Sequence, residues 1–134
     1  MSLVLLNQGE SDWLSMAVNK AAPQNLLLRL YKSNTTPAET DTEASFTEAD
    51  FTGYASATLT GANWSVTPGA PSEASFAQQV FTSSADQTSQ DVYGYYLTQL
   101  TSGRAQWAER FPSGPYPIAN SGDNIGVTPK ITLD

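Results

Sequence analysis

The run VYGYYLTQLTSGRAQWAERF, residues 92–111, determines which class of structure this chain can form. Aromatic and aliphatic side chains dominate residues 92–100 and 106–111, and such residues favour strands. Gly, Ser and other turn-forming residues bound both segments. We therefore predict a short strand in each.

Similar segments recur along the rest of the chain. They are residues 25–32, 55–60, 64–67, 74–83, 124–127 and 130–133. Residues 61–63 read Gly-Ala-Asn and predict a turn, so that a hairpin places Trp64 and Val66 on one face. About eight short strands separated by turns are typical of an antiparallel β-sandwich or barrel and not of β-α-β units.

Only the N-terminal part of the sequence has a helical pattern. Apolar residues recur there at spacings of three and four, namely Trp13, Leu14, Ala17, Val18 and Ala21. This spacing predicts one short amphipathic helix over residues 11–22, with Ser11 or Asp12 as its cap. We expect residues 1–24 to form an arm that carries this helix, and residues 25–134 to form the β-sandwich domain.

Two segments have the composition of loops. Residues 33–47 are rich in Thr, Ala and acids and have no apolar period, which predicts a long exposed loop. Residues 112–117 read PSGPYP, and their prolines lack the N–H groups that a strand interior needs. We expect an extended surface loop there.

Charge restricts the partners of this chain. The formal net charge is −7, and no Lys or Arg lies between Lys32 and Arg104, a stretch with eight acidic residues. Nucleic acids and anionic membranes both bind cationic surfaces, so we expect neither as a partner. The short apolar run at residues 3–6 has no basic residue before it, which predicts neither a signal peptide nor a membrane span.

The sequence contains no His and no Cys, which excludes most small catalytic sites. Ser-His-Asp triads, Cys-His pairs and zinc-bound water all require these residues. Carboxylate chemistry of the glycosidase type stays open, with Glu48 and Asp50 as the candidate acids. Two acids at this spacing are more often solvated, so we expect no enzyme and no cofactor.

The acidic loop also raises the question of calcium. Asp41, Glu43, Glu48 and Asp50 offer oxygen ligands close together in sequence. The spacing of an EF-hand is absent, and so is a glycine-rich repeat. We favour a chance accumulation of acids over a metal site.

Trp64 and Trp107 allow two interpretations. Exposed aromatic rings stack on sugars, whereas buried ones form a core, and we expect the core for both residues. In residues 106–111, Glu109 shares a strand face with Trp107 and Phe111. An acid among aromatic rings needs a partner, and the sequence suggests Arg29 or Arg104.

Several phrases, taken in order, resemble small virion proteins of tailed bacteriophages. The resemblance covers residues 25–134, and its motifs are LYKSN at 30–34, FTEADFTGY at 46–54, VYGYY at 92–96, WAERF at 107–111 and GDNIGVTPKITL at 122–133. The group that they resemble is that of capsid decoration, or cement, proteins. The order of these motifs carries the resemblance, because each motif alone is unspecific.

The resemblance implies both a fold and a function. It implies a mainly β protein with a jelly-roll type of antiparallel sandwich, which binds the outer surface of the phage head as a homo-oligomer, a dimer or trimer. The partner would be the major capsid protein, no catalytic residue is implied, and the chain would be made in the host cytoplasm. A tail- or fibre-associated module that binds host glycans is the alternative.

Contacts with a partner are expected where apolar and aromatic residues lie outside the predicted core. The candidates are Leu3, Val4, Leu5, Leu6, Trp13, Phe111, Pro112 and Tyr116. For residues 3–6 the sequence allows a second interpretation, an edge strand of the chain's own sheet.

Overall fold

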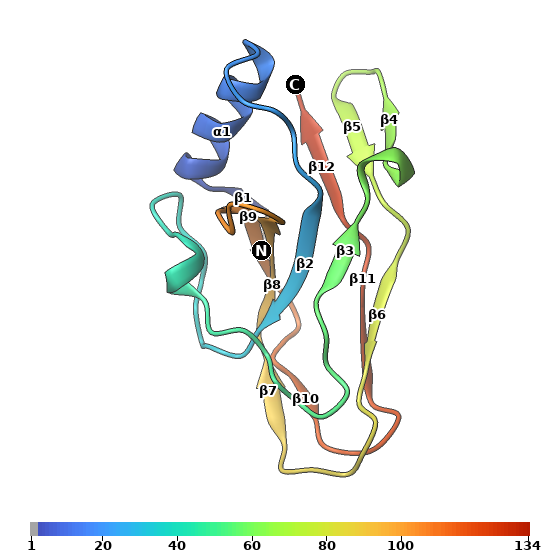
Figure 1. Cartoon of the computed structure of the whole chain (residues 1–134). Helices are drawn as coiled ribbons and strands as arrows, with labels where there is room; N and C mark the ends of the chain where they lie inside the picture. Colours follow the sequence, from blue (N-terminus) through green and yellow to red (C-terminus); the bar gives the residue numbers. More distant parts are fainter. Residues whose placement is uncertain (1–2) are drawn as a thin grey trace.

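The computed structural model describes residues 3–134, and it is mainly β, as the sequence predicts. In this part of the chain one α-helix, α1 (Asn7–Ala17), accompanies twelve short strands (Figure 1). The strands are β1 (Val4–Leu5), β2 (Leu26–Tyr31), β3 (Ala57–Leu59), β4 (Ser65–Thr67), β5 (Ser72–Ser75), β6 (Gln79–Thr82), β7 (Gln90–Val92), β8 (Gly94–Gln99), β9 (Ala105–Arg110), β10 (Tyr116–Ile118), β11 (Asn124–Val127) and β12 (Lys130–Leu133).

The largest sheet has five antiparallel strands in the order β1-β9-β8-β2-β3. At its centre, β8 pairs with β2 and β9 over six and five residues respectively. Gly94 permits this close pairing, because a Cβ atom there would collide with the Glu109 carbonyl and the Tyr31 ring. Only glycine fits this position without displacing the backbone of β9.

Three smaller antiparallel sheets complete the body: β12-β5-β4, β11-β6 and β10-β7. The main core joins them to the large sheet, since buried side chains of the β11-β6 and β10-β7 sheets and the partly buried Ile131 of β12 pack together with those of the large sheet. Its largest members are Leu28, Leu30, Phe51, Phe81, Tyr95, Leu97, Trp107, Ile118 and Ile125. The structure therefore consists of short strands stacked around one elongated apolar core.

The loop of residues 33–47 has a structural role, because it covers the face of the large sheet that the main core does not. Phe46 is buried and stacks on Tyr96, with 4.9 Å between ring centroids, and it also contacts the buried ring of Tyr31. Most of the loop is exposed or half-buried, in line with the prediction, and its buried residues are Pro37 and Phe46. One aromatic residue holds an otherwise polar segment onto the sheet and forms a second core cluster.

The N-terminal helix exists, but the predicted bounds are wrong. It begins at Asn7, four residues before Ser11, and Leu6 occupies its cap position without a side-chain hydrogen bond. Asp12, a predicted cap, instead accepts hydrogen bonds from the side chains of Arg104 and Gln106. The helix can begin early because Gly9 lets its first turn lie against the backbone of Gln106. It ends at Ala17, before Asn19 adopts a positive φ of 61°.

Three details of strand pairing differ from the sequence prediction. The hairpin around residues 61–63 does not form, since β3 pairs with β2 and β4 pairs with β5. The predicted strand over residues 74–83 is divided into β5 and β6, which pair with β12 and β11 respectively. The loop over residues 112–117 ends in β10, where Tyr116 and Pro117 pair with β7. Long-range pairing decides all three, and local sequence does not contain it.

Candidate functional site

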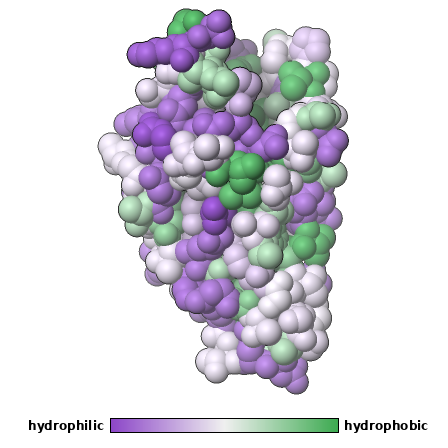
Figure 2. Space-filling model, in the orientation of Figure 1, coloured by the Kyte–Doolittle hydropathy of each residue, from purple (hydrophilic) through white to green (hydrophobic). Residues whose placement is uncertain are grey.

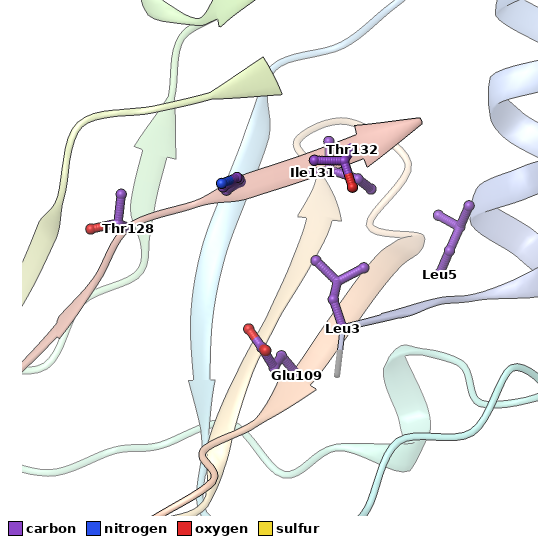
Figure 3. Close-up of a pocket in the computed structure, with 7 residues that line it drawn as sticks. Leu3, Leu5, Glu109, Thr128, Ile131 and Thr132 are labelled. Atoms are coloured by element: carbon purple, nitrogen blue, oxygen red, sulfur yellow. The ribbon is translucent and has the colours of Figure 1, made fainter. Parts of the chain in front are cut away.

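The large sheet and the β12-β5-β4 sheet each end in a strand with one free edge, β1 and β12 respectively. A pocket of about 630 Å³ separates these two strands, and Figure 3 shows Leu5 of β1 and Leu3, the residue before β1, projecting toward Ile131 of β12. Glu109 of β9 lies in the same pocket. This side of the molecule therefore exposes both apolar side chains and unpaired strand edges.

The pattern of hydrogen bonds between β12 and β5 shows which peptide groups of β12 are free. The N–H of Phe76 donates to the carbonyl of Pro129, so this pair is a hydrogen-bonded one. In an antiparallel ladder such pairs alternate, which turns the peptide groups of Ile131 and Leu133 toward β5. The N–H and C=O groups of Lys130 and Thr132 consequently point away from β5, along the pocket.

Glu109 is the charged residue of this pocket on the side of β9. It accepts a hydrogen bond of 2.7 Å from the hydroxyl of Tyr95, directly across the β8–β9 pair. Burial and the adjacent carboxylate both raise the pKa of Tyr95, so its hydroxyl keeps its proton and remains a donor. The carboxylate is thus fixed in position by a neutral group.

The predicted cationic partners of Glu109 are wrong. Arg29 binds Glu48 through two bonds of 2.8 and 2.9 Å, and Arg104 binds Asp12 at 2.9 Å. The remaining cation at the pocket, Lys130, pairs with Glu73 at 2.9 Å. Among residues 3–134, Glu109 forms no salt bridge.

Two further apolar pockets continue from this one toward the helix. One lies between α1 and the end of β12, and the other between α1, β4 and the large sheet. The residues that join the three pockets are Leu5, Trp13, Ile131 and Leu133. We call the continuous surface formed by Leu3, Leu5, Trp13, Leu14, Glu109, Ile131 and Leu133 the open-side groove.

The open-side groove leaves large apolar side chains in water. Leu14 of α1 is 69% exposed and Leu133 of β12 is 59% exposed. Trp13 is held in place at the base, because its Nε1 donates to the side chain of Gln106 at 3.1 Å and its ring meets Trp107 edge-on. On the face shown in Figure 2, by contrast, hydrophobic residues form small separate areas among hydrophilic and neutral ones.

The structure divides the predicted contact residues into three groups. Leu3, Leu5 and Trp13 meet in the open-side groove. Leu6 is completely buried and Val4 packs beside it in the second core cluster, so Leu6 offers no surface to a partner. Val4 and Leu5 form the edge strand β1, and Leu3 and Leu5 also line the groove.

Of the remaining three candidates, Phe111 and Pro112 lie in the segment between β9 and β10, and Tyr116 is the first residue of β10. The rings of Phe111 and Tyr116 contact each other with 5.2 Å between centroids, and Pro112 is exposed. Sequence reasoning missed Leu14, Ile131 and Leu133 as groove residues. Their strand and helix were predicted, but which strand would lie at an edge depends on the pairing of distant segments.

The candidate acids Glu48 and Asp50 have separate cationic partners. Glu48 binds Arg29 and accepts the hydroxyl of Tyr54 at 2.7 Å, while Asp50 binds Lys32 at 2.8 Å. The hydrogen bond from Lys32, then that from Gln90, lowers the pKa of Asp50. A general acid of a glycosidase needs a raised pKa, which is the opposite direction.

The four possible calcium ligands are also used separately. Asp41 accepts the backbone N–H of Ala38, and Glu43 accepts both the side chain of Gln8 and the N–H of Ala105. Within residues 3–134 no three Asp or Glu side chains gather in a way that would hold a metal ion. Asp41 thus bonds within the loop of residues 33–47, and Glu43 fastens this loop to α1 and β9.

The two tryptophans in question lie side by side. Trp107 is 2% exposed, so it belongs to the core as predicted, and Trp64 contacts it with 6.3 Å between ring centroids. Trp64 is half-buried and lines the pocket between α1 and β4. Only Trp64 of this pair presents a ring to solvent.

No protein-family model matches the sequence, and no curated protein or solved structure is significantly similar to it. Over residues 3–134, no helix has the length and apolar character needed to cross a membrane.

Proposed function

We propose that this chain is a non-enzymatic virion structural protein that decorates and stabilises the outer surface of a bacteriophage capsid by binding the major capsid protein. It acts as a homo-oligomer, a dimer or trimer, and its strands form a jelly-roll type of sandwich. The ordered motifs over residues 25–134 support this proposal, as does the mainly β structure. It would be made in the host cytoplasm and reside on the virion.

The observation that carries the proposal is the open-side groove. Soluble monomers rarely leave a continuous apolar surface in water, and such surfaces usually mark sites of protein association. Leu14 and Leu133, both more than half exposed, border a groove that also contains two free strand edges. Covering this surface with a partner would remove apolar area from water, which drives association.

Charge supports a partner of the opposite sign. With a net charge of −7, the chain is repelled by acidic surfaces and attracted to basic ones. A stable shell assembled from many copies of a basic-faced protein would suit it. Electrostatic attraction of this kind raises the rate of association and loses strength as salt is added.

The test is to locate the protein on purified particles of the phage that encodes it. Cryo-electron microscopy should show density for the protein on the outside of the head, and its absence from the particle or a position inside the shell would refute the proposal. Particles made without the protein should bind it when it is added back.

A matched pair of variants tests whether the open-side groove makes the contact. Leu133→Asp places a charge in the groove, whereas Val80→Asp places one on β6, where Val80 is exposed to a similar degree, 56% against 59%. We expect the first variant to lose binding to particles and the second to keep it. Equal binding by both variants would exclude the groove as the contact surface.

The alternative, a tail-associated module that binds glycans, has one observation in its favour. Trp64 lines an apolar pocket beside Trp13 and is only half-buried, so a sugar ring has access to one aromatic face. Glycan-array signals that disappear in Trp64→Ala would favour this alternative over capsid decoration.

A further inference from the structure

We propose that the open-side groove binds an extended, basic segment of the partner protein, which pairs with β12 as an added strand and places a Lys or Arg against Glu109. This inference rests on the proposed function, because the segment would belong to the capsid protein. It adds the chemistry of the bound segment and the position of each of its contacts.

One edge of β12 is unpaired. The N–H and C=O groups of Lys130 and Thr132 point away from β5, and neither residue's peptide groups have a partner among residues 3–134. A free edge of this kind is a template for another chain, and proteins usually protect it with charge, proline or a covering segment. Lys130 is the single charge on β12, and its side chain is bound to Glu73.

Apolar side chains lie next to that edge. Leu3, Leu5 and Ile131 line the same pocket as the free edge (Figure 3). Leu133 extends the apolar surface toward α1. A strand presents alternate side chains to one face, so an added strand would place every second residue in the groove. The bound segment should therefore be apolar at alternate positions.

The groove also carries acidic charge. Glu109 is only partly exposed and is hydrogen-bonded to the neutral hydroxyl of Tyr95. Lys130 at the pocket is bound to Glu73, and Arg110 donates to the carbonyl of Thr35 and lies over the ring of Tyr93. Glu10 adds a second acid where the groove meets α1. A cationic side chain of the partner would complement this end of the groove.

The same charge argues against a second copy of this chain as the occupant. Each copy carries a net charge of −7, and six cations are spread over 134 residues. Within residues 3–134, the strands that combine apolar residues at alternate positions with a nearby cation include β2 and β12, and both are already paired with other strands of the chain. A foreign basic segment fits the groove better.

Selection from a library of short random peptides tests the proposal with the intact protein as bait. We expect the enriched peptides to be apolar at every second position and to contain a Lys or Arg. Failure to enrich peptides, or enrichment of acidic ones, would overturn the proposal.

Two proline variants form the matched control. Thr132→Pro removes an N–H that points along the groove and blocks the edge of β12. Thr58→Pro makes the same change in β3, the edge strand of the large sheet that lies farthest from β1. The N–H of Leu100 donates to the carbonyl of Asn25, so the alternation along β2 turns the peptide groups of Leu27 toward β8 and not toward β3. Thr58 of β3 lies opposite Leu27, so its peptide groups point away from β2 as well. Proline at an outward-facing edge position leaves the ladder intact.

We expect Thr132→Pro to weaken peptide binding at least about tenfold, as loss of one or two hydrogen bonds and a steric block requires. Thr58→Pro should bind with the affinity of the unchanged protein. Circular dichroism and thermal unfolding check that both variants are folded. Equal binding by the two variants would refute pairing with β12.

Glu109→Gln isolates the charge contact. It should reduce the affinity for a Lys- or Arg-containing peptide by about tenfold. The affinity for the same peptide with Gln in place of the cation should not change. A loss that is equal for both peptides would show that Glu109 does not meet the cation.

Light scattering separates a foreign segment from a second copy. If the unchanged protein forms an oligomer that Thr132→Pro converts to monomer, the edge of β12 is used between copies and the proposal fails. The proposed function is judged separately, by the location of the protein on the virion. Protein found on the capsid without any effect of Thr132→Pro would refute only the strand pairing.

Discussion

The two sides of the large sheet differ in how completely their polar groups are paired. On the covered face, the loop of residues 33–47 places Phe46 over the sheet, and Arg29, Glu48 and Tyr54 satisfy one another. On the open side, Glu109 has one neutral partner and β12 has unpaired peptide groups. One side of the large sheet is therefore covered, whereas the side next to β12 leaves polar groups without partners among residues 3–134.

The difference shows where stability and binding capacity lie in this protein. A region with paired charges and buried aromatic rings adds to the free energy of unfolding, whereas exposed leucines and free edges add little to it. The exposed leucines and free edges remain available for contact with a partner. Mutations in the two regions should therefore separate folding from binding.

The largest expected effect is the contrast between Phe46→Ala and Leu133→Ala. Removing the buried ring of Phe46 should lower the free energy of unfolding by about 3 kcal/mol or more, because it leaves a cavity against Tyr31 and Tyr96. Leu133 is 59% exposed, so Leu133→Ala should change stability by less than about 1 kcal/mol. Urea unfolding measures both, and similar losses would remove the distinction between the two regions.

The second contrast compares two salt bridges. Arg29→Met removes a partly buried partner whose Nη1 donates to both carboxylate oxygens of Glu48, and it leaves Glu48 with the Tyr54 hydroxyl, so we expect a loss of about 1 to 2 kcal/mol. Lys130→Met breaks an exposed pair with Glu73 and should cost less than about 0.5 kcal/mol. Double-mutant cycles with Glu48→Gln and Glu73→Gln measure the two coupling energies. A larger coupling for the Lys130 pair would contradict this order.

The third contrast concerns the single hydrogen bond that holds Glu109. Tyr95→Phe removes the donor from a buried position and should lower the free energy of unfolding by about 1 kcal/mol. Tyr116→Phe changes an exposed hydroxyl without a hydrogen bond in the structure, and it should be neutral. If chemical denaturation gives no difference between the two, the Tyr95 hydroxyl does not fix Glu109.

Local composition was sufficient to predict most of the strands. The segments 124–127 and 130–133 coincide with β11 and β12, and residues 25–32 contain β2, because aliphatic side chains between turn residues are a local signal. The division of residues 74–83 into β5 and β6 was missed. It depends on their pairing with β12 and β11, which lie far away in the sequence.

The candidate site could be predicted only in part for the same reason. Leu3, Leu5 and Trp13 were identified as apolar residues outside the predicted sandwich, and they do line the groove. The free edge of β12 could not be foreseen, since an edge is a property of strand order and not of composition. The partner of Glu109 was missed because Tyr95 lies opposite it only in the observed register.

The smallest expected effect is a dependence of stability on pH that originates in the covered region. Hydrogen bonds from Lys32 and then Gln90 lower the pKa of Asp50 in the folded protein below its ordinary value of 3.8. The unfolded chain binds this proton more readily, so the contribution of Asp50 to stability is present above that value and is lost as the pH falls through the lower, folded pKa. The thermal midpoint should decrease between about pH 5 and about pH 3, and Asp50→Asn should reduce that decrease.

Asp91→Asn is the control, because the Asp91 side chain is exposed and forms no hydrogen bond or salt bridge among residues 3–134. An acid transition that Asp50→Asn leaves unchanged would show that the Lys32–Asp50 pair does not contribute to stability.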